Sequence, residues 1–113
     1  MNRKVNVLMK MLRAIIRPEK EHDVVLALEG AGFPALTKSH VFGRGKQKGL
    51  RVGSAHYEEL PKLVLLMVLE DCDVDRVVQV ILKTAYTGNI GDGKIFVGLV
   101  DQAYTIRTGK QEL

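Results

Sequence analysis

Residues 63–69 form an unbroken apolar run, LVLLMVL, and this run constrains the fold more than any other part of the chain. The run is too short to cross a membrane as a helix, which takes about 18 residues. A strand with one wet face would alternate apolar and polar side chains, so the run predicts a strand that is buried on both faces. Helices can cover one face, and we expect a second subunit to cover the other, in a closed homo-oligomer.

Strand and helix patterns alternate on both sides of this run. Pro18 ends a first strand and opens a helix, because its missing N–H is not needed in the first turn. Asp73 is expected as the N-cap of a second helix, whose apolar side chains recur at helical spacing. The predicted elements are, in order, a strand over 12–16, a helix from Pro18 to Gly30, a strand over 35–42, a loop over 43–59, the strand over 63–69, a helix from Asp73 to Gly88 and a strand over 94–100.

This order of elements predicts an α/β (α+β) fold of the ferredoxin-like type, a split βαββαβ sandwich with a long loop between its second and third strands. Residues 1–10 show no clear period and are expected to be a flexible N-terminal extension, with one domain over residues 11–113. A loop as long as residues 43–59 with no structure of its own is usually functional or disordered.

Composition excludes several classes of protein. The net charge of +4 is mild, and the single cysteine excludes a disulfide framework or a cysteine zinc site, so we expect a cytoplasmic protein without a membrane segment. The strands over 12–16 and 63–69 lack the aromatic side chains on which RNA-binding modules stack bases, so no nucleic acid is expected. The histidines show no metal spacing, and Cys72 lies between two aspartates that oppose thiolate formation. We therefore expect a protein that is not an enzyme.

The strongest local signal is the string TGNIGDGK at residues 87–94. Gly88, Gly93 and Lys94 fit the spacing of a phosphate-binding loop, in which glycines let successive N–H groups face one anion and a lysine neutralises its charge. Ile95 stands where a triphosphatase loop has its metal-binding serine or threonine, and the loop runs from a helix into a strand. The string predicts either phosphate binding without hydrolysis or a tight connection.

A second signal is the basic, glycine-rich string GRGKQKG at residues 43–49. Its cations and Gln47 suit an anion with Mg²⁺, and they equally suit a solvated hairpin tip. Lys62, just beyond the long loop, can reach a carboxylate or extend to water. Arg107 near the end of the chain can hold a phosphate with both guanidinium nitrogens or be solvated.

Together these segments resemble the PII family of nitrogen-regulatory signal proteins. The matching strings are RAIIRP at 13–18, QKG at 47–49, LPK at 60–62, TGNIGDGKIF at 87–96 and IRTG at 106–109. The resemblance implies a trimer of ferredoxin-like subunits with ATP or ADP in the clefts between neighbours. The implied nucleotide-binding residues are Ile15, Gly43, Gly45, Lys46, Gln47, Val68, Gly91, Asp92, Gly93, Lys94 and Arg107, and the implied 2-oxoglutarate-binding residues are Gln47, Lys48, Gly49, Lys62 and Gly91.

Individual roles follow from the same resemblance. The loop over 91–94 would hold the phosphates, and Arg107 would reach in from the adjacent subunit. Gln47 would help to position Mg²⁺ and 2-oxoglutarate, and Lys62 would pair with the distal carboxylate of 2-oxoglutarate. Ile15 and Val68 would line the base pocket. The surface of the long loop that contacts a target would include Arg44, Lys48, Arg51 and Tyr57.

The chain departs from the common PII pattern. Lys46 and Thr105 stand where the family usually has arginine, so phosphate contacts are altered. The long loop is about four residues shorter, and Tyr57 lacks the usual spacing of the modified tyrosine. These features resemble the branch encoded with nitrogenase in archaea and some anaerobic bacteria. That branch implies a homotrimer, or a hetero-oligomer with a sister PII-like protein, that inhibits dinitrogenase until 2-oxoglutarate releases it. The alternative is a PII-type regulator of an ammonium channel or of glutamine synthetase control.

Overall fold

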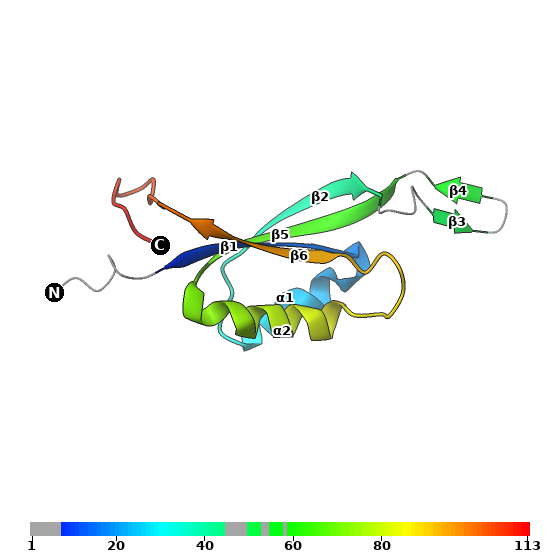
Figure 1. Ribbon diagram of the computed structural model, residues 1–113, viewed down its shortest axis with the longest axis horizontal. Helices are drawn as coiled ribbons and strands as arrows, with labels where there is room; N and C mark the ends of the chain where they lie inside the picture. Colours follow the sequence, from blue (N-terminus) through cyan, green and yellow to red (C-terminus); the bar gives the residue numbers. More distant parts are fainter. Residues whose placement is uncertain (1–7, 45–49, 53–54, 58) are drawn as a thin grey trace.

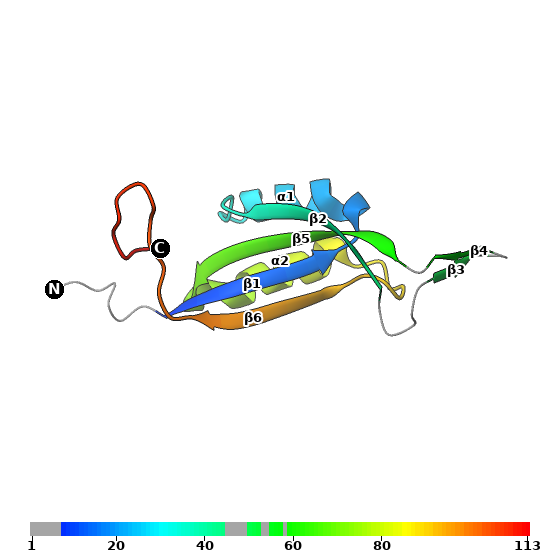
Figure 2. The ribbon, with the colours of Figure 1, turned by 90° about the horizontal axis from the view of Figure 1, so that it is seen from above.

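The computed structural model describes residues 8–44, 50–52, 55–57 and 59–113. Four strands form one antiparallel sheet in the order β2-β5-β1-β6, and two helices pack side by side on one of its faces (Figures 1 and 2). This arrangement confirms the predicted α+β ferredoxin-like fold. The elements of the layered body are β1 (Met9–Ile16), α1 (Glu21–Gly30), β2 (Thr37–Gly43), β5 (Leu60–Glu70), α2 (Val74–Ala85) and β6 (Lys94–Val100).

The hydrophobic core lies between the sheet and the two helices. Successive side chains of a strand point to opposite faces, so alternate residues of β1 and β5 face the helices. The fully buried side chains in this layer include Leu12 and Leu65 from the sheet, Leu28 from α1 and Ile81 from α2. The apolar stripe predicted for the second helix is therefore the face that covers the sheet.

The opposite face of β5 differs from the predicted burial on both faces. Val64, Leu66 and Val68 are only half-buried, because no helix lies on their side of the sheet. A single chain thus buries one face of this strand completely. That a neighbouring subunit covers the other face stays a prediction.

Several boundaries correct the sequence-based expectations. The sheet begins at Met9, which pairs with Glu70, so the predicted extension over 1–10 is wrong for its last two residues, and residues 1–7 lie outside the described part of the chain. Asp73 makes no capping hydrogen bond, because it is the last residue of a 3-10 turn, η3 (Asp71–Asp73), and has helical backbone angles. Pro18 likewise opens a 3-10 turn, η2 (Pro18–Lys20), before α1 begins.

The segment predicted as an unstructured loop over 43–59 contains two short strands. β3 (Leu50–Val52) pairs antiparallel with β4 (Ala55–Tyr57), and Figure 1 shows this ladder projecting beyond the end of the sheet. Three-residue strands are too short for an alternation pattern to stand out among glycines and charges, which is why the sequence did not predict them.

The side chain of Arg76 joins the two helices. Its guanidinium lies 4.9 Å from the centre of the Phe33 ring and donates a 3.1 Å hydrogen bond to the carbonyl oxygen of Ala31, just after α1. The carbonyl groups at a helix end have no partner within the helix, so this contact satisfies one of them.

We predict that Arg76→Ala lowers the free energy of unfolding by about 1 kcal/mol, because alanine removes a cation–π contact and a hydrogen bond without a helix-propensity penalty. Urea denaturation followed by circular dichroism measures the change. Gln79→Ala, an exposed substitution on the same helix, is the control and should be nearly neutral. Equal stability of the two variants would show that the Arg76 contact adds nothing.

Candidate functional site

Three separate segments meet at the end of the sheet where β1 stops. In the antiparallel register, Ile15 lies opposite both Val64 and Lys94, and Val41 lies opposite Lys62. The loop over 86–93, which joins α2 to β6, crosses this end (Figure 1). The register therefore brings the phosphate-loop string beside Lys62 and the base of the segment over 44–59.

Asp92 holds the 86–93 loop together. Its carboxylate accepts hydrogen bonds from the backbone N–H groups of Thr87 and Gly88, at 2.8 and 2.9 Å, and from the Thr87 hydroxyl. It also accepts a 2.9 Å hydrogen bond from Nε of Arg17, directly after β1. The Thr87 contacts, followed by those from Arg17 and Gly88, hold the pKa of Asp92 well below its ordinary value.

Two cations bind backbone carbonyl groups of the same loop. Arg17 donates a 2.9 Å hydrogen bond to the carbonyl oxygen of Ile90, and the Lys62 ammonium donates one of 2.6 Å to that of Gly91. Partial burial, and then the nearby charge of Arg17, lower the pKa of Lys62. Arg17 is ion-paired with Asp92, whereas Lys62 bonds a neutral carbonyl group, so the charge of Lys62 makes this glycine loop an electropositive corner that suits an anion.

Gly93 is the tightest point of the site. It adopts a φ of 109°, and a Cβ built on it would lie 1.7 Å from the carbonyl oxygen of Ile15. Only glycine fits where the loop crosses the end of β1, so backbone contact dictates this residue. Gly91 has a φ of 105° and faces the Arg17 guanidinium, with 3.2 Å between a built Cβ and that side chain.

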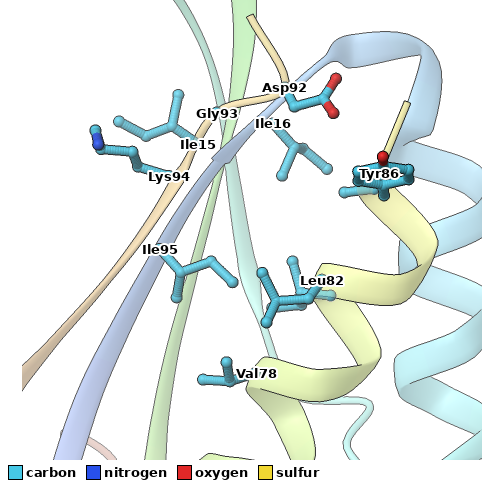
Figure 3. Close-up of a pocket in the computed structure, with 11 residues that line it drawn as sticks. Ile15, Ile16, Val78, Leu82, Tyr86, Asp92, Gly93, Lys94 and Ile95 are labelled. Carbon is cyan, nitrogen blue, oxygen red and sulfur yellow. The ribbon is translucent and has the colours of Figure 1, made fainter. Parts of the chain in front are cut away.

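A cavity of about 320 Å³ lies beneath this loop, on the helix side of the sheet. Figure 3 shows Leu82 of α2 and Tyr86, directly after that helix, facing it across from Ile95, whereas Lys94 points away from the helix. The cavity is mainly apolar, and the sequence had not indicated it. Lys94 and Ile15 instead share the helix-free face, as their position in the strands requires.

The structure brings most of the described site residues to this corner but leaves two at the other end. The residues that meet are Ile15, Gly43, Lys62, Gly91, Asp92, Gly93 and Lys94. Val68 lies opposite Met11, four residues along β5 from Val64, or roughly 13 Å at ~3.3 Å per residue. It lines a second cavity, of about 240 Å³, together with Ala35 and Leu113. Arg107 belongs to the C-terminal segment at that end (Figures 1 and 2).

Part of the expected site lies outside the described residues. Gly45, Lys46, Gln47, Lys48 and Gly49 are among these, and the side chains of Arg51 and Tyr57 are not described either. Arg44 follows β2 directly and is exposed.

Sequence reasoning gave no role to Arg17 or Thr87. Their signal was topological: in a ferredoxin-like fold the end of strand 1 lies beside the start of the last strand, so a basic residue after strand 1 reaches the loop before that strand. Within the ranges that the structure describes, no group of three or more histidine, cysteine, aspartate or glutamate side chains could hold a metal ion. No helix in these ranges is long and apolar enough to cross a membrane.

Comparison with known proteins gives consistent matches. Residues 9–110 match the family model described as Nitrogen regulatory protein P-II. A nitrogen fixation nifHD region GlnB-like protein 1 of Methanothermobacter marburgensis is 58% identical, over 93% of this chain and 100% of the relative. A nitrogen fixation nifHD2 region GlnB-like protein 1 of Methanosarcina barkeri is 54% identical, with coverage of 93% and 100%. The nitrogen regulatory protein P-II 2 of Methanothermobacter thermautotrophicus is 47% identical, with coverage of 92% and 94%.

We predict that Gly93→Ala destabilises the protein strongly. A side chain in this backbone conformation costs about 1–3 kcal/mol, and the contact with the Ile15 carbonyl adds to it. The matched control is Gly98→Ala in β6, where a built Cβ meets nothing within 4 Å. Thermal melting of both variants measures the difference, and a Gly93→Ala melting temperature equal to that of Gly98→Ala would contradict the close approach.

The lowered pKa of Asp92 predicts a pH-dependent stability. Because the folded-state pKa lies below the unfolded value of about 3.9, the ionised carboxylate stabilises the folded protein above that value. This contribution falls as the pH drops towards the folded-state pKa. Asp92→Asn should therefore melt at a lower temperature than the native protein at pH 7, and the gap should narrow below about pH 4. A gap that widens in acid would have the wrong sign.

Proposed function

The chain belongs to the nitrogen regulatory protein P-II family, and on this premise we propose that it senses ATP or ADP together with 2-oxoglutarate and passes this state to a nitrogenase component by direct contact. Members of this family are signalling regulators and not enzymes, as the sequence predicted. The relatives named for nifHD regions confirm the resemblance to the nitrogenase-associated branch. We infer cytoplasmic action, since the proposed ligands are cytoplasmic metabolites.

One observation carries the ligand proposal: Arg17 and Lys62 converge on the glycine loop over 86–93 at the base of the segment over 44–59. In the proposed complex, the loop around Gly91 and Gly93 holds the phosphates and Lys94 supplies charge. Asp92 takes part in this scheme through its backbone position between Gly91 and Gly93. The cations attract a polyanionic nucleotide, and a bound ligand stands directly beside the segment whose shape it controls.

The separation of the expected nucleotide-binding residues between the two ends of the sheet supports an assembly of several copies. The phosphate corner lies at one end of the sheet, whereas Val68 and Arg107, two further expected nucleotide residues, lie at the other. A closed trimer, or a hetero-oligomer with a sister protein, sets one protomer's corner against the tail end of the next. The same assembly covers the half-buried apolar side chains on the helix-free face of β5.

2-Oxoglutarate acts at Lys62 in this proposal. The ammonium group bonded to the Gly91 carbonyl turns to a carboxylate of the effector, while Gln47 positions Mg²⁺ and Lys48 and Gly49 complete the pocket. Lys62 packs beside Gly43, where a built Cβ would lie 3.9 Å from its Cγ. A movement of Lys62 therefore reaches the start of the segment over 44–59, whose residues Arg44, Lys48, Arg51 and Tyr57 form the proposed target surface.

Isothermal titration calorimetry tests this scheme. We expect 2-oxoglutarate to bind the native protein only when MgATP is present. Lys62→Ala should weaken 2-oxoglutarate binding at least about tenfold, the effect of losing one hydrogen bond between charged groups, and should retain MgATP binding. Lys83→Ala, an exposed lysine of α2, is the control. Equal 2-oxoglutarate binding without nucleotide would refute the coupling, and unchanged binding by Lys62→Ala would remove that residue from the site.

A further inference from the structure

The position of Asp92 poses an electrostatic problem for an anion site. A carboxylate in a loop that binds phosphate should repel its ligand unless its charge is taken up within the protein. The geometry resolves the problem, since all four donors to Asp92 come from the protein itself: two backbone N–H groups, the Thr87 hydroxyl and Nε of Arg17. Both carboxylate oxygens are thus turned into the loop.

We propose that Asp92 is a positioning residue, which with Arg17 and Thr87 holds the 86–93 loop in the shape that receives the nucleotide phosphates and does not itself contact the ligand. This inference rests on the proposed function, because it concerns how the same site is prepared for MgATP. It gives the conspicuous aspartate of the GDGK string a role inside the protein.

Three further contacts support this role. The Asp92 N–H donates to the Asn89 carbonyl at 3.3 Å, and the Asn89 N–H donates to the Thr87 hydroxyl at 3.2 Å, so the carboxylate closes a ring of hydrogen bonds within the loop. Arg17 extends this ring to the end of β1 through its bond to Ile90. These contacts within the protein hold the loop at both ends of its turn, which reduces the ordering cost of binding.

The two possible roles of Asp92 predict opposite signs for one substitution. If its charge merely stands near the ligand, Asp92→Asn removes a repulsion and releases the Arg17 cation, so MgATP should bind more tightly. If Asp92 positions the loop, the same substitution replaces acceptor oxygens by an amide that cannot accept every bond, and MgATP should bind more weakly.

The experiment measures the Kd for MgATP by calorimetry, and the melting temperature, for the native protein and four variants. We expect Asp92→Asn to raise the Kd about tenfold, the size of one lost hydrogen bond to a charged group. Thr87→Val should raise the Kd severalfold, and Thr87→Ser, which keeps the hydroxyl, should restore native binding. Asp75→Asn removes the same charge from the first turn of α2, at the far end of that helix, and should leave the Kd for MgATP unchanged.

The outcomes separate the inference from the proposed function. A folded Asp92→Asn protein with a native or lower Kd overturns the positioning role, even if its melting temperature falls. Should Asp92→Asn fail to fold, the threonine pair decides: equal Kd values for Thr87→Val and Thr87→Ser overturn the role, and a weaker Thr87→Val supports it. A native protein that takes up no MgATP overturns the proposed function itself.

Discussion

The crossing of Gly93 over the carbonyl group of Ile15 sets the geometry of the whole functional end of the molecule. A side chain at this position would collide with the backbone, so only glycine lets the loop after α2 approach the end of β1 this closely. This approach puts Asp92 within reach of Arg17 and Gly91 within reach of Lys62. The electropositive corner is thus a consequence of one backbone contact, to which the side chains add their charges.

Much of the fold could be predicted because its signals are local or periodic. The apolar run over 63–69, the stripe along α2 and the proline stop after β1 correspond to observed elements, whereas α2 ends at Ala85, three residues before the predicted stop at Gly88. Boundaries were less predictable: Met9 joins β1 because Glu70 lies opposite it, and that pairing is a tertiary fact. The short ladder of β3 and β4 likewise depends on cross-strand pairing that no pattern of so few residues reveals.

The candidate site divides in the same way, into residues that local sequence signals indicate and residues that depend on tertiary contacts. The glycines and Lys62 were indicated by residue type and spacing, and the structure brings the described ones together. Arg17 was invisible as a site residue because its partner Asp92 is 75 positions away in sequence. The sequence likewise could not show that the Asp92 carboxylate points into the loop and accepts hydrogen bonds from four donors. A charged residue in a motif indicates the chemistry of a site, but the direction in which its side chain points is known only from the hydrogen bonds that it makes.

The pairing of β2 with β5 has a mechanical meaning for the segment between them. The ladder continues to the pair Gly43 and Leu60, so the segment over 44–59 leaves and re-enters the body through two directly adjacent strands. The two ends of this segment are held next to each other by the ladder, so they cannot move apart while the strands stay paired. Lys62 lies two register steps inside the pair Gly43 and Leu60, opposite Val41, so a twist of the two strands there would turn both ends of the segment together.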